Sequence, residues 1–239
     1  MNTKSLLTMA FAALLAVSCS KTKSAGGLNF SVVAGQIDEV VTKGQVSDYV
    51  ALPATSAFTL VVKDGKGQTI YNGLLTDWNP ETQLQSGNYT AQASYGSDTD
   101  EGIAKPYFVG TEEFSITGGQ TTDVVITVSL GNAIVKVVAT DNFKKYYPTY
   151  SFKVTTPENI AGFDCTDSSV FVSWKFTVAG TVTSQSGKTQ TLEAKNFQAE
   201  AATCYTVKYD VTNVGGVSVT VSFNDTVDTV NLGEIELND

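Results

Sequence analysis

Apolar and polar residues alternate with a period of two along most of this chain. The clearest example has Val217, Val219, Val221 and Phe223 separated by Ser and Thr. Successive side chains of a β-strand point to opposite faces, so this pattern predicts a strand with one buried face and one exposed face. The same alternation predicts further strands at 28–32, 58–62, 89–95, 126–130, 150–154 and 205–211.

Turn-forming residues separate these segments. Glycine-rich stretches lie at 64–67, 85–88, 117–120 and 213–216. Short strands joined by such turns are typical of antiparallel β-sandwiches, so the predicted fold class is all-β. No segment has an apolar stripe of helical period over three turns. The best helical candidate is one turn at 79–81, where Asn79 can cap and Pro80 can take the first helical position.

The β pattern between Val124 and Val138 is interrupted only by Gly131 and Asn132. We place a domain boundary there, because a sandwich of about 100 residues then fits on each side. The predicted domains are residues 27–130 and 131–239. No Pro-rich or Ser-rich linker lies between them, so we expect the two sandwiches to pack end to end with limited freedom.

The N-terminal segment has the features of an export signal. Lys4 precedes an apolar run at 6–17, which is too short to span a bilayer. The run ends in Ala16-Val17-Ser18-Cys19, which is similar to a bacterial lipobox. We therefore predict a signal peptide at 1–18, a lipidated Cys19 that contacts the membrane, and a polar tether at 19–26. The alternative is an ordinary secretory signal with an incidental cysteine.

Charge and composition exclude several classes of function. The chain has 24 Asp and Glu against 15 Lys, a net charge of −9, and neither Arg nor His. Phosphate neutralisation needs clustered cations, so we expect no nucleic-acid partner. Without His, the usual general base and the commonest metal ligand are missing. We predict no catalytic residue, no metal and no cofactor.

Two tryptophans differ in their predicted roles. Trp78 lies in the polar stretch 76–80, where an exposed indole could stack on a sugar ring or could plug the end of a sandwich. Trp174 lies in the apolar run 170–176 and is expected in the core. The mixed segment 143–147, with two lysines between aromatic residues, is predicted to be a turn.

A polar loop at 97–102 holds the carboxylates Asp98, Asp100 and Glu101. Such loops supply oxygen ligands to Ca²⁺, but an EF-hand pattern that starts at Asp98 would place Ile103 where glycine is needed. A solvated acidic loop is the favoured interpretation.

Cys165 and Cys204 remain once the lipid cysteine is set aside. An exported protein could form a disulfide between them, but two free thiols are favoured, because Cys204 is out of phase with the apolar series that begins at Tyr205.

Several stretches of the chain resemble a family of Bacteroidetes lipoproteins associated with cell adhesion. They include GLNF at Gly27, FTLVVKDGKGQTIYNG at Phe58, LQSGNYTAQASYG at Leu84 and AATCYTVKYDV at Ala201. The chain is also similar to fimbrillins and fimbrial-anchor proteins of the same bacteria. This resemblance implies tandem transthyretin-like or immunoglobulin-like Greek-key sandwiches, with fimbrial subunits, a host surface or a glycan as partners.

Other features follow from the same resemblance. Thr226 and Thr229 lie in Asp-Thr-Val triplets that resemble the O-glycosylation acceptor of these bacteria. Polymerising fimbrillins are typically matured by an Arg-specific protease, and this chain has no Arg to cut. Lys21 and Lys23 stand where surface-exported lipoproteins of this kind tend to carry acidic residues.

We therefore expect a non-enzymatic outer-membrane lipoprotein that acts in adhesion or as a fimbria-related anchor or accessory component. A location at the cell surface is favoured over the periplasmic face. Two alternatives stay open: a glycan-binding accessory lipoprotein of a polysaccharide-uptake system, and a periplasm-facing structural lipoprotein.

Overall fold

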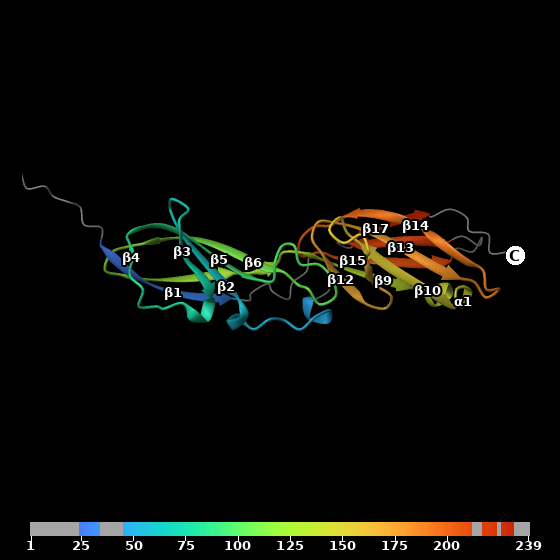
Figure 1. Cartoon of the computed structure of the whole chain (residues 1–239), viewed down its shortest axis with the longest axis horizontal. Helices are drawn as coiled ribbons and strands as arrows, with labels where there is room; N and C mark the ends of the chain where they lie inside the picture. Colours follow the sequence, from blue (N-terminus) through green and yellow to red (C-terminus); the bar gives the residue numbers. More distant parts are fainter. Residues whose placement is uncertain (1–23, 34–44, 212–216, 224–225, 232–239) are drawn as a thin grey trace, which may run out of the picture.

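The computed structural model describes residues 24–33, 45–211, 217–223 and 226–231. Nearly all the secondary structure in these residues is β, which confirms the predicted all-β sandwich class. Figure 1 shows an elongated molecule in which strands from residues 25–130 occupy one end and strands from residues 133–231 occupy the other. Among the described residues, no helix has the length and apolar character needed to cross a membrane.

The strands of the first half form two sheets. The first sheet has the order β4 (Leu84–Gln85), β1 (Ala25–Val33), β7 (Thr121–Thr127). The second has the order β3 (Thr69–Leu74), β2 (Thr59–Asp64), β5 (Gly87–Tyr95), β6 (Phe108–Ile116), β8 (Ser129–Leu130). All neighbours are antiparallel except β1 and β7, which run parallel. The predicted hairpins are therefore combined with one long-range parallel pair.

The strands of the second half also form two sheets. One sheet has the order β11 (Phe163–Asp164), β10 (Thr149–Thr155), β13 (Lys175–Thr183), β14 (Thr189–Gln198). The other has the order β12 (Ser169–Val172), β9 (Ala133–Ala139), β15 (Cys204–Val211), β16 (Val217–Phe223), β17 (Thr226–Asn231). Here β9 and β15 form the parallel pair.

One short α-helix, α1 (Asp141–Tyr146), lies where the sequence predicted a turn, so that prediction was wrong. The Thr140 hydroxyl caps its N-terminus by accepting a hydrogen bond from the backbone N–H of Phe143 at 3.1 Å. Phe143 is fully buried. A helix of six residues is unstable alone, so the packing of Phe143 into the core stabilises it.

The helical turn predicted at 79–81 is absent, and a hydrogen-bonded turn replaces it. The backbone N–H of Thr82 donates to the carbonyl of Asn79 at 3.0 Å, and the Asn79 side chain accepts from the N–H of Glu81 at 3.0 Å. Short 3₁₀ turns occur at η1 (Val46–Asp48), η2 (Thr55–Ala57) and η3 (Leu75–Asp77).

Buried apolar residues form two clusters, one in each half of the molecule. Three residues of the second half, Ile134 on β9, Phe171 on β12 and Cys204 on β15, belong to the cluster of the first half. Phe171 and Cys204 are both direct strand partners of Ile134. Apolar packing therefore continues past residue 131, and the boundary predicted there stays a prediction.

Candidate functional site

The acidic loop that follows β5 joins the two halves of the molecule. Oε1 of Glu101 accepts a hydrogen bond from the backbone N–H of Ser173 at 2.9 Å, and Oε2 accepts one from the Thr156 hydroxyl. The Ser173 hydroxyl donates to the Asp98 carbonyl at 2.9 Å. A single carboxylate thus binds two segments of the second half.

Backbone contacts reinforce this junction. Gly102 and Phe171 exchange two N–H···O bonds of 2.9 Å each. Gly102 has φ +126°, and a Cβ there would lie 3.1 Å from the ring of Phe163, so a larger residue would be strained. The side chain of Asn132 is almost fully buried; it accepts from the N–H of Tyr107 at 3.2 Å and donates to the Lys105 carbonyl at 3.0 Å.

These contacts replace the cation site considered for Asp98, Asp100 and Glu101. Oδ2 of Asp100 accepts from the backbone N–H of Ser97 at 3.0 Å, which shapes the loop itself. In the described part of the chain, no three acidic, Cys or His side chains converge in a way that could hold a metal ion. The structure gives the loop a role in joining the two halves.

Trp78 packs into a row of aromatic rings. It meets Phe30 and Tyr71 edge to face, with both centroid distances 5.1 Å. The row continues from Phe30 to Phe114 at 5.9 Å. Nε1–H of Trp78 donates to the Leu28 carbonyl at 3.1 Å. Two roles were considered for this half-buried indole, stacking on a sugar and packing at the end of the sandwich. These contacts favour packing.

Trp174 is not in the core, so that prediction was wrong. Its side chain is 52% exposed. The apolar run 170–176 is not one strand, because β12 ends at Val172 and β13 begins at Lys175. Trp174 lies in the bend between them, where the alternation that predicted its burial no longer applies.

Cys165 and Cys204 are free thiols, which corrects the alternative of a disulfide between them. Cys165 lies in the core of the second half and Cys204 in that of the first. The Cys204 thiol donates to the Tyr49 hydroxyl at 3.1 Å. Burial raises the pKa of both thiols, that of Cys165 to about 11.

Three predicted modification sites are not tested by the structure. Cys19 lies outside the described residues. Thr226 and Thr229 belong to β17, where they pair with Phe223 and Thr220, but their side chains lie outside the described part.

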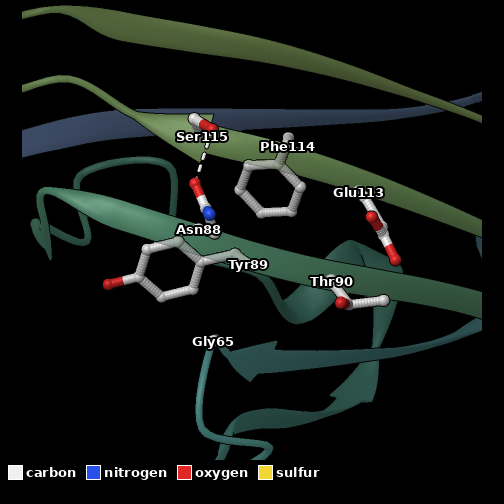
Figure 2. A pocket seen from close by; sticks show the side chains of 7 residues that line it. All are labelled: Gly65, Asn88, Tyr89, Thr90, Glu113, Phe114 and Ser115. Atoms are coloured by element: carbon white, nitrogen blue, oxygen red, sulfur yellow. Dashed lines mark hydrogen bonds between the residues drawn. The ribbon is translucent and has the colours of Figure 1, made fainter.

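The structure also contains a pocket that the sequence did not predict. It has a volume of about 450 Å³, and we call it the β5–β6 pocket. Figure 2 shows its lining residues: Gly65, Asn88, Tyr89, Thr90, Glu113, Phe114 and Ser115.

Strand pairing brings the polar residues of this pocket together. Asn88 is opposite Ser115 and Thr90 is opposite Glu113, so these four alternate positions share one face of β5 and β6. The buried side chain of Tyr89 points to the other face. In the sequence, these residues were visible only as the polar positions of two alternating segments about 25 residues apart. Without the register between the two strands, those positions could not be assigned to one site.

Comparisons with known proteins found similar solved structures and one matching family model. The chain is similar to a fimbrial assembly protein from Parabacteroides distasonis, with 13% identity, a TM-score of 0.46, and coverage of 87% of this chain and 97% of that chain. It is also similar to the fimbrial anchor protein Mfa2 from Porphyromonas gingivalis, with 10% identity, a TM-score of 0.36, and coverage of 85% of this chain and 98% of that chain. Both are of the fimbria-related kind that the sequence resembles. No curated protein matches the chain, and a family model described as "Domain of unknown function (DUF4493)" matches residues 24–238.

Proposed function

Since this chain belongs to the family described as a domain of unknown function (DUF4493), we propose a function from its own geometry and sequence. The protein is a non-enzymatic lipoprotein of the outer membrane. It acts in cell adhesion, or as an anchor or accessory component of a fimbria. The observation that carries this proposal is the hydrogen-bonded, end-to-end junction between the two halves (Figure 1).

A fixed junction suits a protein that must hold a partner away from the membrane. Glu101 and Gly102 bind the second half through a carboxylate and through paired backbone groups. Ile134, Phe171 and Cys204 add apolar packing across the same region. Loss of any one contact would leave the others in place, so the two halves are expected to transmit force as one elongated body.

The proposed anchor is the lipid on Cys19. Ala25, where β1 begins, is six positions after Cys19. At about 3.3–3.6 Å per residue, an extended tether of this length reaches roughly 20 Å. The first half would therefore lie close to the membrane and the second half farther from it, where a fimbrial subunit or a host surface could be bound.

The absence of His and Arg supports a role without catalysis. A chain with no imidazole lacks the residue that most often transfers protons near neutral pH. An excess of acidic side chains also disfavours nucleic acid as the partner.

The proposal is tested on intact cells of the native host. An epitope tag is inserted after Ser186, in the exposed turn between β13 and β14, and cells are treated with a protease that cannot cross the outer membrane. We expect loss of the tag while a known periplasmic protein stays intact. Protection of the tag until lysis would overturn surface adhesion and favour a periplasm-facing structural lipoprotein.

The anchor is tested separately by Cys19→Ser. This variant should leave the membrane fraction, whereas Cys165→Ala, which removes a different thiol, should stay in it. Attachment of a deletion strain to surfaces is then compared with strains that carry the native gene or Cys19→Ser. Adhesion that is unchanged by deletion would contradict the proposed function.

A further inference from the structure

The β5–β6 pocket has the hydrogen-bonding groups of a small polar binding site. Oδ1 of Asn88 accepts a hydrogen bond from the Ser115 hydroxyl at 2.8 Å (Figure 2). This bond orients the amide and leaves its NH₂ group free to donate to a ligand. Within the described part of the chain, the side chains of Thr90 and Glu113 make no hydrogen bond to another residue. One amide, two hydroxyls and one carboxylate are therefore gathered on one face.

A glycine borders the pocket, and an aromatic ring packs on the opposite, core face of the sheet. Phe114 is half-buried and stacks on Tyr89 with a centroid distance of 5.8 Å and an interplanar angle of 18°. Gly65 brings the β2–β3 hairpin against β5; a Cβ there would lie 3.2 Å from the Asn88 carbonyl oxygen. Because residue 65 has no side chain, the pocket stays open on that side. Because Phe114 is the strand partner of Tyr89, its ring points to the core face, and the side chains presented at the pocket are polar.

The charge of the lining restricts the ligand. Glu113 is its only charged residue, and no Lys lines the pocket. Lys63 lies opposite Thr90 on β2 but does not line the pocket. A phosphate, sulfate or uronic acid inside the pocket would therefore contact the Glu113 carboxylate and no lysine of the lining, which is unfavourable. A neutral ligand rich in hydroxyl groups fits better, because its O–H groups can donate to Glu113 and its oxygens can accept from Asn88.

The position of β5 inside its sheet disfavours strand addition of a peptide at that strand. β5 is hydrogen-bonded to β2 on one side and to β6 on the other, so Thr90 offers no free strand edge. The outer side of β6 is paired with β8 only at Phe108 and Val109. Inside the pocket, recognition would use side chains, which suits the scattered hydroxyl groups of a sugar.

We infer that the β5–β6 pocket binds a neutral saccharide through Asn88, Thr90, Glu113 and Ser115. This inference goes beyond the proposed function, because the pocket lies in the first half, whereas the partner of that function was placed at the second half. The pocket lies at the end of the first half where β1 begins, because Ala25 pairs with Gln85, three residues before Asn88. Its ligand is either a glycan of the cell's own envelope or a glycan from outside the cell.

The test is calorimetric titration of the protein purified in detergent from its native host. One arm uses neutral oligosaccharides of glucose, mannose, galactose and xylose, a second uses polysaccharide isolated from the envelope of the same host, and a third uses acidic oligosaccharides. We expect binding in the first or second arm, which distinguishes the two sources, and none in the third.

Variants then place the site. Asn88→Ala removes a hydrogen-bond donor to the ligand, and Glu113→Gln removes the charge that strengthens the hydrogen bonds accepted by residue 113. Each substitution should weaken binding about tenfold or more. The matched control is Glu112→Gln, the same change at an exposed neighbour that does not line the pocket. It should leave affinity unchanged. Melting temperatures verify that all three variants are folded.

Several outcomes would overturn the inference: no binding in either neutral arm, binding of acidic oligosaccharides alone, or equal affinities for Asn88→Ala, Glu113→Gln and the native protein. These measurements do not depend on where the protein lies in the cell. If the purified protein binds no saccharide but the tag on intact cells is cleaved, only the saccharide site is overturned. If the protein binds a saccharide but the tag is protected from the protease, only surface adhesion is overturned.

Discussion

Replacing Glu101 by Ala should loosen the junction between the two halves. The Glu101 carboxylate accepts from the N–H of Ser173 at 2.9 Å and from the hydroxyl of Thr156. Thr156 is only 4% exposed. The substitution leaves both donors without this acceptor, at a place where other backbone contacts already hold the chain.

The magnitude follows from these two bonds. Hydrogen bonds to a charged group contribute about 1.5–3 kcal/mol each to stability. Glu101 is half-buried, so water can replace part of what is lost. We expect the free energy of unfolding to fall by about 2–3 kcal/mol. For a chain of this size, that corresponds to a decrease in Tm of roughly 5–10 °C.

Urea denaturation and calorimetry measure this change. Glu101→Gln keeps an acceptor for Ser173 without the charge and should lose about half as much. Glu158→Ala removes an exposed carboxylate two residues from Thr156 and should change stability by less than about 0.5 kcal/mol. If Glu101→Ala were as stable as Glu158→Ala, the carboxylate would not hold the junction.

Spin labels report on the arrangement of the two halves directly. Labels at exposed Lys66 and Gln185, one in each half, should give a narrow distance distribution in the native protein. The distribution should broaden in Glu101→Ala. An equally narrow distribution in both proteins would show that packing alone fixes the junction.

Four further substitutions or treatments test local features. Trp78→Phe removes the N–H that donates to the Leu28 carbonyl, so it should cost about 1 kcal/mol in urea denaturation; native-like stability would contradict the role of that bond. The pKa of Cys165 is about 11 because of burial, so its thiol should resist alkylation at pH 8 until the protein unfolds, which mass spectrometry detects. In the unfolded chain this thiol has its ordinary pKa and loses its proton at lower pH than in the folded protein. The free energy of unfolding should therefore fall as the pH rises from about 9 to 11, and a constant value over this range would refute the effect of burial. Gly110→Ala would place a Cβ 2.0 Å from the backbone oxygen of Thr127, so we expect a loss of about 2–3 kcal/mol by thermal denaturation, and an unchanged Tm would contradict the close approach.

The period-two pattern was sufficient to predict most strands, because alternation depends on residues that are adjacent in sequence. The predicted strands at 89–95, 150–154 and 205–211 fall within β5, β10 and β15. The same local reasoning failed where tertiary contacts decide the conformation. Helix α1 depends on the burial of Phe143, and Trp174 is exposed because a bend divides the run that contains it.

The sequence by itself determined the all-β class, the absence of imidazole and guanidinium chemistry, and the acidic balance, since each follows from residue types and their spacing along the chain. Tertiary structure alone decided the role of Glu101, whose partners lie 55 and 72 residues away. It also decided the β5–β6 pocket, where strand register sets Asn88 beside Ser115. The physical reason is that contacts between distant segments depend on register and packing, which alternation along one strand does not specify.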